Sequence, residues 1–403
     1  MQFDTPLRAS HRAFVAQDAA RRAERAREAR GAVATRREVE IEYLPFGPAD
    51  AEGAPTCEVV AAYAEVELEY AAIRSGCALV DACERGSLVV RGKDRVDFVN
   101  RLVTQDLKRL PEGGVVRAFL TNRKGRIDAD LVIAALPDAL VVDTLVHDVA
   151  SVRDALEKMV FAEDVAVESR TATHARLTIA GPRAAVALKA LGLAAPATTT
   201  EAWSVAFGGG RAEIMRFDEY GVEAFAIMVA RGDAPSLWLS LTTFGARPAG
   251  WFATNTARLE AGTPYFRIDF GPTNLPHESG VLDSRVSFTK GCYPGQEVVA
   301  RLQHLGKPKQ KLVGLRIEGD LLPVSEAQVF AFVEGGSIGE QVGVVTSSGL
   351  APMLGAAPVA FAMIAVASYA DGTRVLVNAE GEQVAARVGP LRFLGANDAG
   401  GAT

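Results

Sequence analysis

The sequence predicts an α+β protein in which two lobes, each built on an antiparallel sheet, precede a small C-terminal β-barrel. Two observations predict this class. A series of strand, helix, hairpin, strand and helix starts at residue 87, and a related series starts at residue 176. After residue 311 the pattern changes to six short strands separated by turns. Such a pattern favours a closed or nearly closed barrel, because closure hides the sheet edges.

The first 84 residues are predicted to be largely helical. Residues 59–73 form a long, alanine-rich run without Gly or Pro, and residues 21–37 place arginines and acids on neighbouring helical turns. Residues 45–55, rich in Pro, Gly and Asp, form a loop between these helices.

The two lobes follow from changes between strand-like and helix-like periodicity. In chain order, the first contains a strand at residues 87–91, a helix at 94–103, hairpin strands at 115–121 and 127–135, a strand at 139–144 and a helix at 149–160. The second contains a strand at residues 176–180, a helix at 183–191, strands at 213–217 and 222–229, and helices at 236–244 and 253–261. The three consecutive glycines at 208–210 have no P-loop Lys or Ser/Thr beside them and predict a hairpin turn.

The barrel strands are short and alternate with turn-rich connections. They are predicted at residues 312–317, 328–333, 341–346, 359–366, 373–377 and 383–388. Residues 396–403 are expected to be a disordered tail.

Composition excludes several classes of protein. The net charge of −6 and the pI near 5.6 argue against a nucleic-acid-binding protein. No apolar run reaches the length of about 20 residues that spans a bilayer, and the start lacks a signal-peptide core. The 4 cysteines and scattered histidines have no metal-site spacing. We therefore expect a cytoplasmic protein with reduced thiols, no metal centre, and no membrane or nucleic-acid partner.

The segment K-G-C-Y-P-G-Q-E carries an unusual mixture of residue types. Its members are Lys290, Gly291, Cys292, Tyr293, Pro294, Gly295, Gln296 and Glu297. A cationic neighbour and a helix N-terminus each lower the pKa of a thiol, so this loop favours a functional thiol at Cys292. A buried structural cysteine is the alternative. Without an identifiable histidine partner, a protease-like nucleophile is not expected.

Two further segments contain candidate site residues. Asp128 and Asp130 are two apart in a predicted strand and share a face, which favours a raised pKa for one of them. Solvated charges on a hairpin rim are an equal alternative. Arg258 precedes Gly262, a natural helix stop, and could bind a carboxylate or be a surface arginine.

At these residues the chain resembles a known family. Residues 275–315, with K-G-C-Y-P-G-Q-E at their centre, resemble the signature of the folate-binding YgfZ family, which shares its fold with the glycine-cleavage T-protein, an aminomethyltransferase that uses tetrahydrofolate. Other segments are similar to the T-protein: residues 5–7, 76–81, 90–92, 102–106, 180–182, 258–262, 311–315, 345–347 and 352–355.

The resemblance implies a ring of three domains around an opening that receives tetrahydrofolate or a one-carbon derivative. Residues 1–310 would form the aminomethyltransferase-like folate-binding region, with the helical segment 1–84 at its start, and residues 311–395 the barrel. Asp130 corresponds to the acid beside the reactive folate nitrogen, and Asp143 stands where the T-protein has an asparagine near the pterin. Glu223 corresponds to the pterin-binding glutamate, and Arg258 to an arginine of the folate site. Residues 216–219 depart from the T-protein's Y-T-G-E.

Two functions from different classes follow from this resemblance. The first is a tetrahydrofolate-binding protein that assists the assembly or repair of iron–sulfur clusters in client enzymes, with Cys292 as its functional thiol and Asp130 beside the folate. The alternative is a folate-dependent aminomethyltransferase acting on a small amine or a carrier-bound group. A folate-binding scaffold without chemistry is a third possibility, which would have no use for the thiol.

Overall fold

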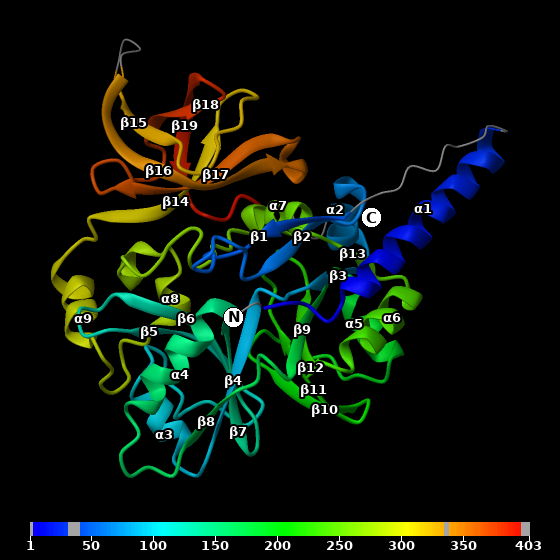
Figure 1. Cartoon of the computed structure of the whole chain (residues 1–403). Helices are drawn as coiled ribbons and strands as arrows, with labels where there is room; N and C mark the ends of the chain where they lie inside the picture. The colour runs from blue at the N-terminus through cyan, green and yellow to red at the C-terminus, as the bar shows by residue number, and fades with distance from the viewer. Residues whose placement is uncertain (1–2, 31–40, 334–337, 396–403) are drawn as a thin grey trace.

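The computed structural model describes residues 3–30, 41–333 and 338–395 (Figure 1). They form two sheet lobes that lie side by side, with a β-barrel above them. The predicted α+β class, with two antiparallel-sheet lobes and a small C-terminal barrel, is confirmed. The predicted tail at 396–403 lies outside the described residues.

The first lobe is a five-stranded antiparallel sheet in the order β5-β6-β7-β4-β8. One of its faces is covered by two helices through a core of aliphatic side chains and Phe98. The elements are β4 (Arg85–Arg91), α3 (Arg95–Asn100), β5 (Val115–Thr121), β6 (Ile127–Ala135), β7 (Ala139–Leu145), α4 (Val149–Glu157) and β8 (Ala166–Ser169). The hairpin of β5 and β6 has the predicted bounds, because alternating apolar residues flank an Asn-Arg-Lys-Gly turn.

The second lobe is a six-stranded sheet in the order β10-β11-β12-β9-β3-β13, antiparallel except for the edge pair β13–β3. Helices cover its outer face, where Val15 of α1 and Leu7, the residue before this helix, pack into the core. The elements are α1 (Arg8–Arg30), β3 (Ala78–Asp81), β9 (His174–Ala180), α5 (Ala184–Ala190), β10 (Ala202–Phe207), β11 (Gly210–Arg216), β12 (Ala224–Ala230), α6 (Ala234–Phe244), β13 (Arg247–Pro248) and α7 (Trp251–Ala261). The predicted hairpin turn lies between β10 and β11, where Gly208 and Gly209 form the turn and Gly210 begins β11.

The barrel closes in the order β14-β17-β16-β15-β18-β19, and β14 pairs with both β17 and β19. Its strands are β14 (Gln310–Ile317), β15 (Gln328–Phe332), β16 (Ile338–Ala351), β17 (Ala357–Ala365), β18 (Arg374–Ala379) and β19 (Glu382–Gly389). The six predicted strands overlap these six, which confirms the predicted barrel.

The predicted helix over residues 59–73 is wrong in its first part. Glu58–Ala62 is strand β2, which pairs with β1 (Glu42–Pro45), and helix α2 occupies only Val66–Ser75. Valines and alanines are compatible with either structure, so pairing with a distant strand decided the outcome. The short strands β3, β8 and β13 were missed for the same reason: their pairing partners are remote in sequence. Strand β10 was also missed, although it pairs with its neighbour β11.

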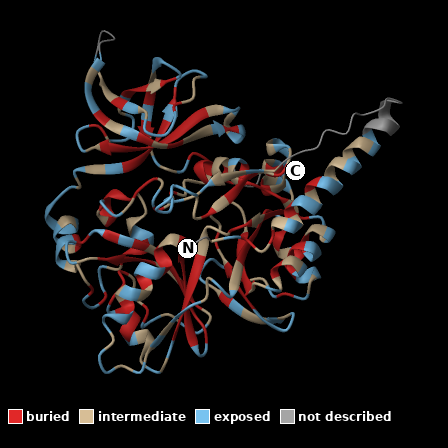
Figure 2. Ribbon diagram, viewed as in Figure 1, coloured by how far each residue is buried: buried red, intermediate tan, exposed pale blue. Residues whose placement is uncertain are grey.

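The two sheets face each other through their uncovered sides. Valines of the first sheet pack against Met215, Phe217 and Met228 of the second. Figure 2 shows this buried layer between the lobes, with exposed residues on the outer helices. In the described part of the chain, no helix combines the length and apolar character needed to span a bilayer.

Candidate functional site

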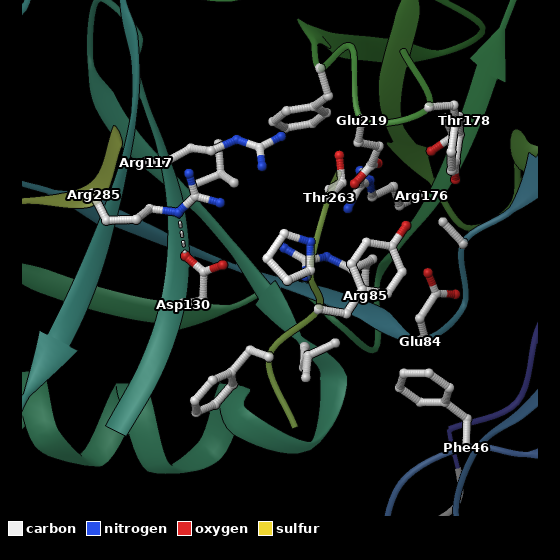
Figure 3. Close-up of a pocket in the computed structure, with 18 residues that line it drawn as sticks. Phe46, Glu84, Arg85, Arg117, Asp130, Arg176, Thr178, Glu219, Thr263 and Arg285 are labelled. Atoms are coloured by element: carbon white, nitrogen blue, oxygen red, sulfur yellow. Dashed lines mark hydrogen bonds and ion pairs between the residues drawn. The ribbon is translucent and has the colours of Figure 1, made fainter. Parts of the chain in front are cut away.

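A cavity opens where the facing sheets cease to be apolar. It contains about 660 Å³ of empty space, part of it continuous with solvent. Both sheets, the loop after α7 and helix α8 (Leu282–Arg285) line it. Its charged and aromatic lining residues are Phe46, Glu84, Arg85, Arg117, Asp130, Arg176, Phe217, Glu219, Tyr220, Tyr265, Phe266 and Arg285 (Figure 3).

Strand register explains how the first sheet contributes to this cavity. Asp130 on β6 lies opposite Phe119 on β5, and Arg117 lies opposite Val132. Because residues two apart share a face, Asp130, Val132 and Arg117 project to the same side. Val132 also lies opposite Asp143 on β7, which places the Asp143 side chain on that face as well.

Asp130, the acid predicted beside the reactive folate nitrogen, lies in the cavity. The Arg285 Nε donates to Asp130 Oδ1 at 3.0 Å and fixes the orientation of the carboxylate. Asp128 points from the same face but lies at the exposed hairpin end, where it accepts a hydrogen bond from the Asn122 amide at 2.8 Å. The two acids therefore have separate partners and separate surroundings.

Asp143 is 1% exposed and does not line the cavity. Two guanidinium groups stand between it and the empty space. Arg85 Nε donates to Asp143 Oδ1 at 2.9 Å, and Arg176 Nη1 lies 3.2 Å from the same oxygen. The negative charge at Asp143 is thus compensated within the protein.

The second sheet supplies the opposite wall. Arg176 and Thr178 project from β9, and Phe217 and Glu219 follow β11. The Glu219 carboxylate lies 3.7 Å from Arg176 Nη2. Glu223, the predicted pterin ligand, does not line this cavity; its carboxylate pairs with Arg216 Nη1 at 3.0 Å, outside the cavity lining.

Arg258 is buried under the cavity and does not line it. Its guanidinium donates to Asp269 Oδ2 at 2.7 Å and to Ser347 Oγ of β16 at 2.8 Å. The same group lies 4.6 Å from the ring centroid of Tyr265, a residue of the cavity wall. Arg258 therefore joins helix α7 to the barrel and supports the loop that closes the cavity.

Two charged groups of the cavity, Arg117 and Glu84, form no ion pair with any residue that the structure describes. Arg117 lies 5.1 Å from the ring centroid of Phe217, and no carboxylate of the described residues lies within 4.0 Å of it. Glu84 likewise forms no ion pair with any residue that the structure describes. Burial raises the pKa of Glu84 to about 7, whereas burial and the nearby Arg285 lower the pKa of Arg117 to about 10.

The segment from Lys290 to Glu297 lies outside the cavity and is fixed by packing. Lys290 Nζ donates to the carbonyl oxygens of Asn100, Val103 and Gln105 at 2.5, 2.5 and 2.9 Å, and burial lowers the pKa of this lysine to about 8. The segment therefore ties the end of α3 to the start of α9 (Gln296–Leu305).

Within the same segment, Gly295 has φ of +79°. A Cβ on Gly295 would lie 2.3 Å from the Asn122 carbonyl oxygen. Thr121 Oγ1 donates to the Pro294 carbonyl at 2.7 Å, and Tyr293 is buried. Cys292, Gly291 and Glu297 are exposed, and Gln296 is half-buried at the start of α9.

Sequence reasoning missed several residues of the cavity, namely Glu84, Arg85, Arg117, Arg176, Glu219 and Arg285. One available signal was Glu219, which belongs to the departing segment 216–219. Another was Arg117, a charged residue at an inward position of an otherwise apolar strand. The described residues contain no group of three His, Cys, Asp or Glu side chains arranged to hold a metal ion.

Comparisons with known proteins identify the family. Residues 49–290 match the GCVT N-terminal domain, and residues 310–394 match the glycine cleavage T-protein C-terminal barrel domain. An aminomethyltransferase of Rubrobacter xylanophilus is 30% identical over 348 residues, covering 83% of this chain and 88% of the relative. One from Moorella thermoacetica is 28% identical over 355 residues, covering 82% and 90%.

A solved structure has the same fold. The glycine cleavage system aminomethyltransferase T of Bartonella henselae superposes with a TM-score of 0.78 at 24% identity, covering 88% of this chain and 94% of that one.

These matches correct the sequence-based family assignment. Membership of the YgfZ family was wrong, as were the iron–sulfur role and the iron–sulfur partners that depended on it, because the matched models and relatives are T-proteins and aminomethyltransferases. The misleading signal was K-G-C-Y-P-G-Q-E, whose Lys290 and Gly295 have structural roles. The chain belongs to the glycine cleavage T-protein family, whose members use tetrahydrofolate.

Proposed function

We propose that this protein is a folate-dependent aminomethyltransferase that acts on a small amine or a carrier-bound aminomethyl group. The observation that carries the proposal is Asp130, a carboxylate oriented by Arg285 on the wall of a cavity between two sheets. The relatives named above are aminomethyltransferases, and this chain matches most of their length.

The cavity has the chemistry that a reduced pterin requires. Tyr265, Phe266 and Phe217 offer apolar faces to a flat bicyclic ring. Carboxylates of Asp130 and Glu219 can accept hydrogen bonds from its ring and amino N–H groups. Aromatic walls combined with polar groups that can orient a ligand are typical of a cofactor or substrate site.

The proposed reaction moves the carbon of X–CH2–NH2 to two nitrogens of tetrahydrofolate and releases ammonia and X–H. Each folate nitrogen loses one proton, and these two protons leave with the amine and with X, so the atoms balance. Asp130, held in place by Arg285, is positioned to accept and return a proton at a folate nitrogen. Arg258 supports Tyr265 and the loop that shields the site from water.

The aspartate at position 143 does not oppose this function. An uncompensated negative charge would change the pocket, because the T-protein resembled by this sequence has an asparagine there. In this chain Arg85 and Arg176 bind Asp143 on the cavity side. A ligand in the cavity would therefore meet these guanidinium groups and not the bare carboxylate. Together with Glu219, which faces Arg176, the two arginines and Asp143 form a group without net formal charge.

The test is turnover by Asp130→Asn and by its neighbour Asp128→Asn as a matched control. Formation of methylene-tetrahydrofolate from an aminomethyl donor should fall about 10²- to 10⁴-fold in Asp130→Asn, the usual contribution of a positioned proton-transfer group. Asp128→Asn should retain activity, because Asp128 is exposed at the hairpin end. Absence of tetrahydrofolate binding to the wild type by calorimetry would refute the proposal.

A further inference from the structure

The arginines of the cavity differ in whether a carboxylate accompanies them. Arg85 and Arg176 share Asp143, Arg176 also faces Glu219, and Arg285 binds Asp130. Arg117 is the exception among the described residues, since its recorded partner is the ring of Phe217. Figure 3 shows its guanidinium directed toward the empty space, above the pair of Arg285 and Asp130.

An unpaired guanidinium in such a place is unfavourable for folding alone. Burial of a charge that no carboxylate contacts costs free energy, and Arg285 and Arg85 add repulsion. The more distant carboxylates of Glu219 and Asp130 offset only part of this cost. The combined effect lowers the pKa of Arg117 to about 10, so the group still carries its positive charge at neutral pH. A group that destabilises the empty fold and points into a cavity is expected to have its partner in a ligand.

We propose that Arg117 is the centre of a carboxylate-binding subsite in the cavity, a proposal that rests on the proposed function. Guanidinium is the side-chain group that binds carboxylate with two parallel hydrogen bonds. Stacking on Phe217 leaves the edge of the guanidinium free to make them. A carboxylate could come from two sources in the reaction: the amine donor or the glutamate tail of tetrahydrofolate.

The position of Arg117 favours the donor. Arg117 and Asp130 occupy diagonal positions on neighbouring strands, and such side chains lie roughly 7–8 Å apart. Asp130 is the proposed proton-transfer group, so a carboxylate on Arg117 lies near the reacting atoms. The glutamate tail is separated from the reactive nitrogens by an aromatic ring and an amide. The inferred donor is therefore an amine that bears a carboxylate, similar to a small amino acid.

The experiment measures binding by calorimetry with two small probes, N-methylglycine and N-methylethanolamine. They share the methylamine group, but a hydroxymethyl group replaces the carboxylate in the second. Wild type should bind N-methylglycine more tightly than N-methylethanolamine. Arg117→Met should weaken N-methylglycine binding about 10- to 100-fold, as expected for a lost hydrogen-bonded charge, and Arg117→Lys should weaken it less. Arg126→Met, an exposed arginine of the neighbouring hairpin, is the control and should match wild type.

A second arm identifies the source of the carboxylate. Tetrahydrofolate and tetrahydropteroate, which lacks the glutamate, are titrated into wild type and Arg117→Met. If the donor carries the carboxylate, Arg117→Met binds both compounds as wild type does. The donor assignment would be overturned in favour of the folate tail by two results together. Arg117→Met would bind tetrahydrofolate, but not tetrahydropteroate, more weakly than wild type does, and wild type would not bind N-methylglycine. Unchanged binding of every probe would refute the subsite itself.

The same data separate this inference from the proposed function. Turnover with tetrahydrofolate but no effect of Arg117→Met would refute the subsite and leave the aminomethyltransferase standing. Arg117-dependent binding of N-methylglycine without tetrahydrofolate binding would refute the aminomethyltransferase and keep the subsite.

Discussion

The cavity and the Lys290–Glu297 segment are opposite kinds of structure. In the segment, the buried polar groups satisfy one another: Lys290 donates to three main-chain carbonyls, and the Pro294 carbonyl accepts from Thr121. In the cavity, Arg117 and Glu84 lie without ion-pair partners in the part of the chain that the structure describes. The buried polar groups of the segment have their hydrogen-bond partners within the protein, whereas the cavity has charges that a ligand can pair with.

This difference shows that an unusual sequence pattern does not by itself mark a reactive site. Gly295 is explained by a left-handed backbone, and Lys290 by anchoring hydrogen bonds. Function is better indicated where the fold leaves charge uncompensated, because such groups cost stability that only a ligand or a reaction explains. Three predictions test the two halves of this comparison.

The largest effect is expected at Gly295. Gly295→Ala should lower the free energy of unfolding by about 2–4 kcal/mol, because it combines a left-handed backbone with a clash against the Asn122 carbonyl. Gly291→Ala is the matched control. A Cβ there meets no atom within 4 Å, so its effect should stay within about 0.5 kcal/mol. Urea unfolding of both variants measures the difference, and equal stabilities would contradict the structural account of the segment.

A smaller effect, dependent on pH, is expected at Glu84. Burial raises its pKa to about 7, with Arg176 and Arg85 opposing the shift and Asp81 adding to it. The folded protein therefore binds this proton more tightly than the unfolded chain, and the resulting stability is lost as pH rises toward and through 7.

Glu84→Gln should remove that loss. Between pH 5 and pH 8, wild type should lose roughly 1–2 kcal/mol relative to the variant. Unfolding curves at both pH values measure this, with the exposed Glu297→Gln as control. Wild-type and Glu84→Gln stabilities that change in parallel with pH would show that the carboxyl is not buried as described.

The smallest effect is expected at Cys292, the residue first expected to be a functional thiol. Its side chain is exposed and lies outside the cavity lining, so Cys292→Ser should change stability by less than about 0.5 kcal/mol and leave turnover unchanged. A turnover assay with wild type and variant in parallel measures this. A loss of turnover comparable to that of Asp130→Asn would show that Cys292 takes part in the reaction, and it would contradict a purely structural role for the segment.

Local pattern was sufficient where an element's own residues decide its structure. Alternation and an Asn-to-Gly turn placed the hairpin of β5 and β6 with its observed bounds, and repeated short strands placed the barrel. It was insufficient at Glu58–Ala62, where pairing with β1 makes a strand of residues that also suit a helix. The same limit applied to Arg258, which was considered as a surface residue but is buried against the barrel.

The sequence alone therefore determined the fold class, the barrel and, through resemblance to a T-protein, the identity of Asp130 as a candidate site residue. Only the tertiary structure decided which charges share the cavity. Arg285 is 155 residues from Asp130, and Arg176 is 33 residues from Asp143. Local propensity depends on neighbours within a few positions, whereas an ion pair depends on distance in space. The unpaired state of Arg117 could not be read from any segment, because it is a property of everything that surrounds it.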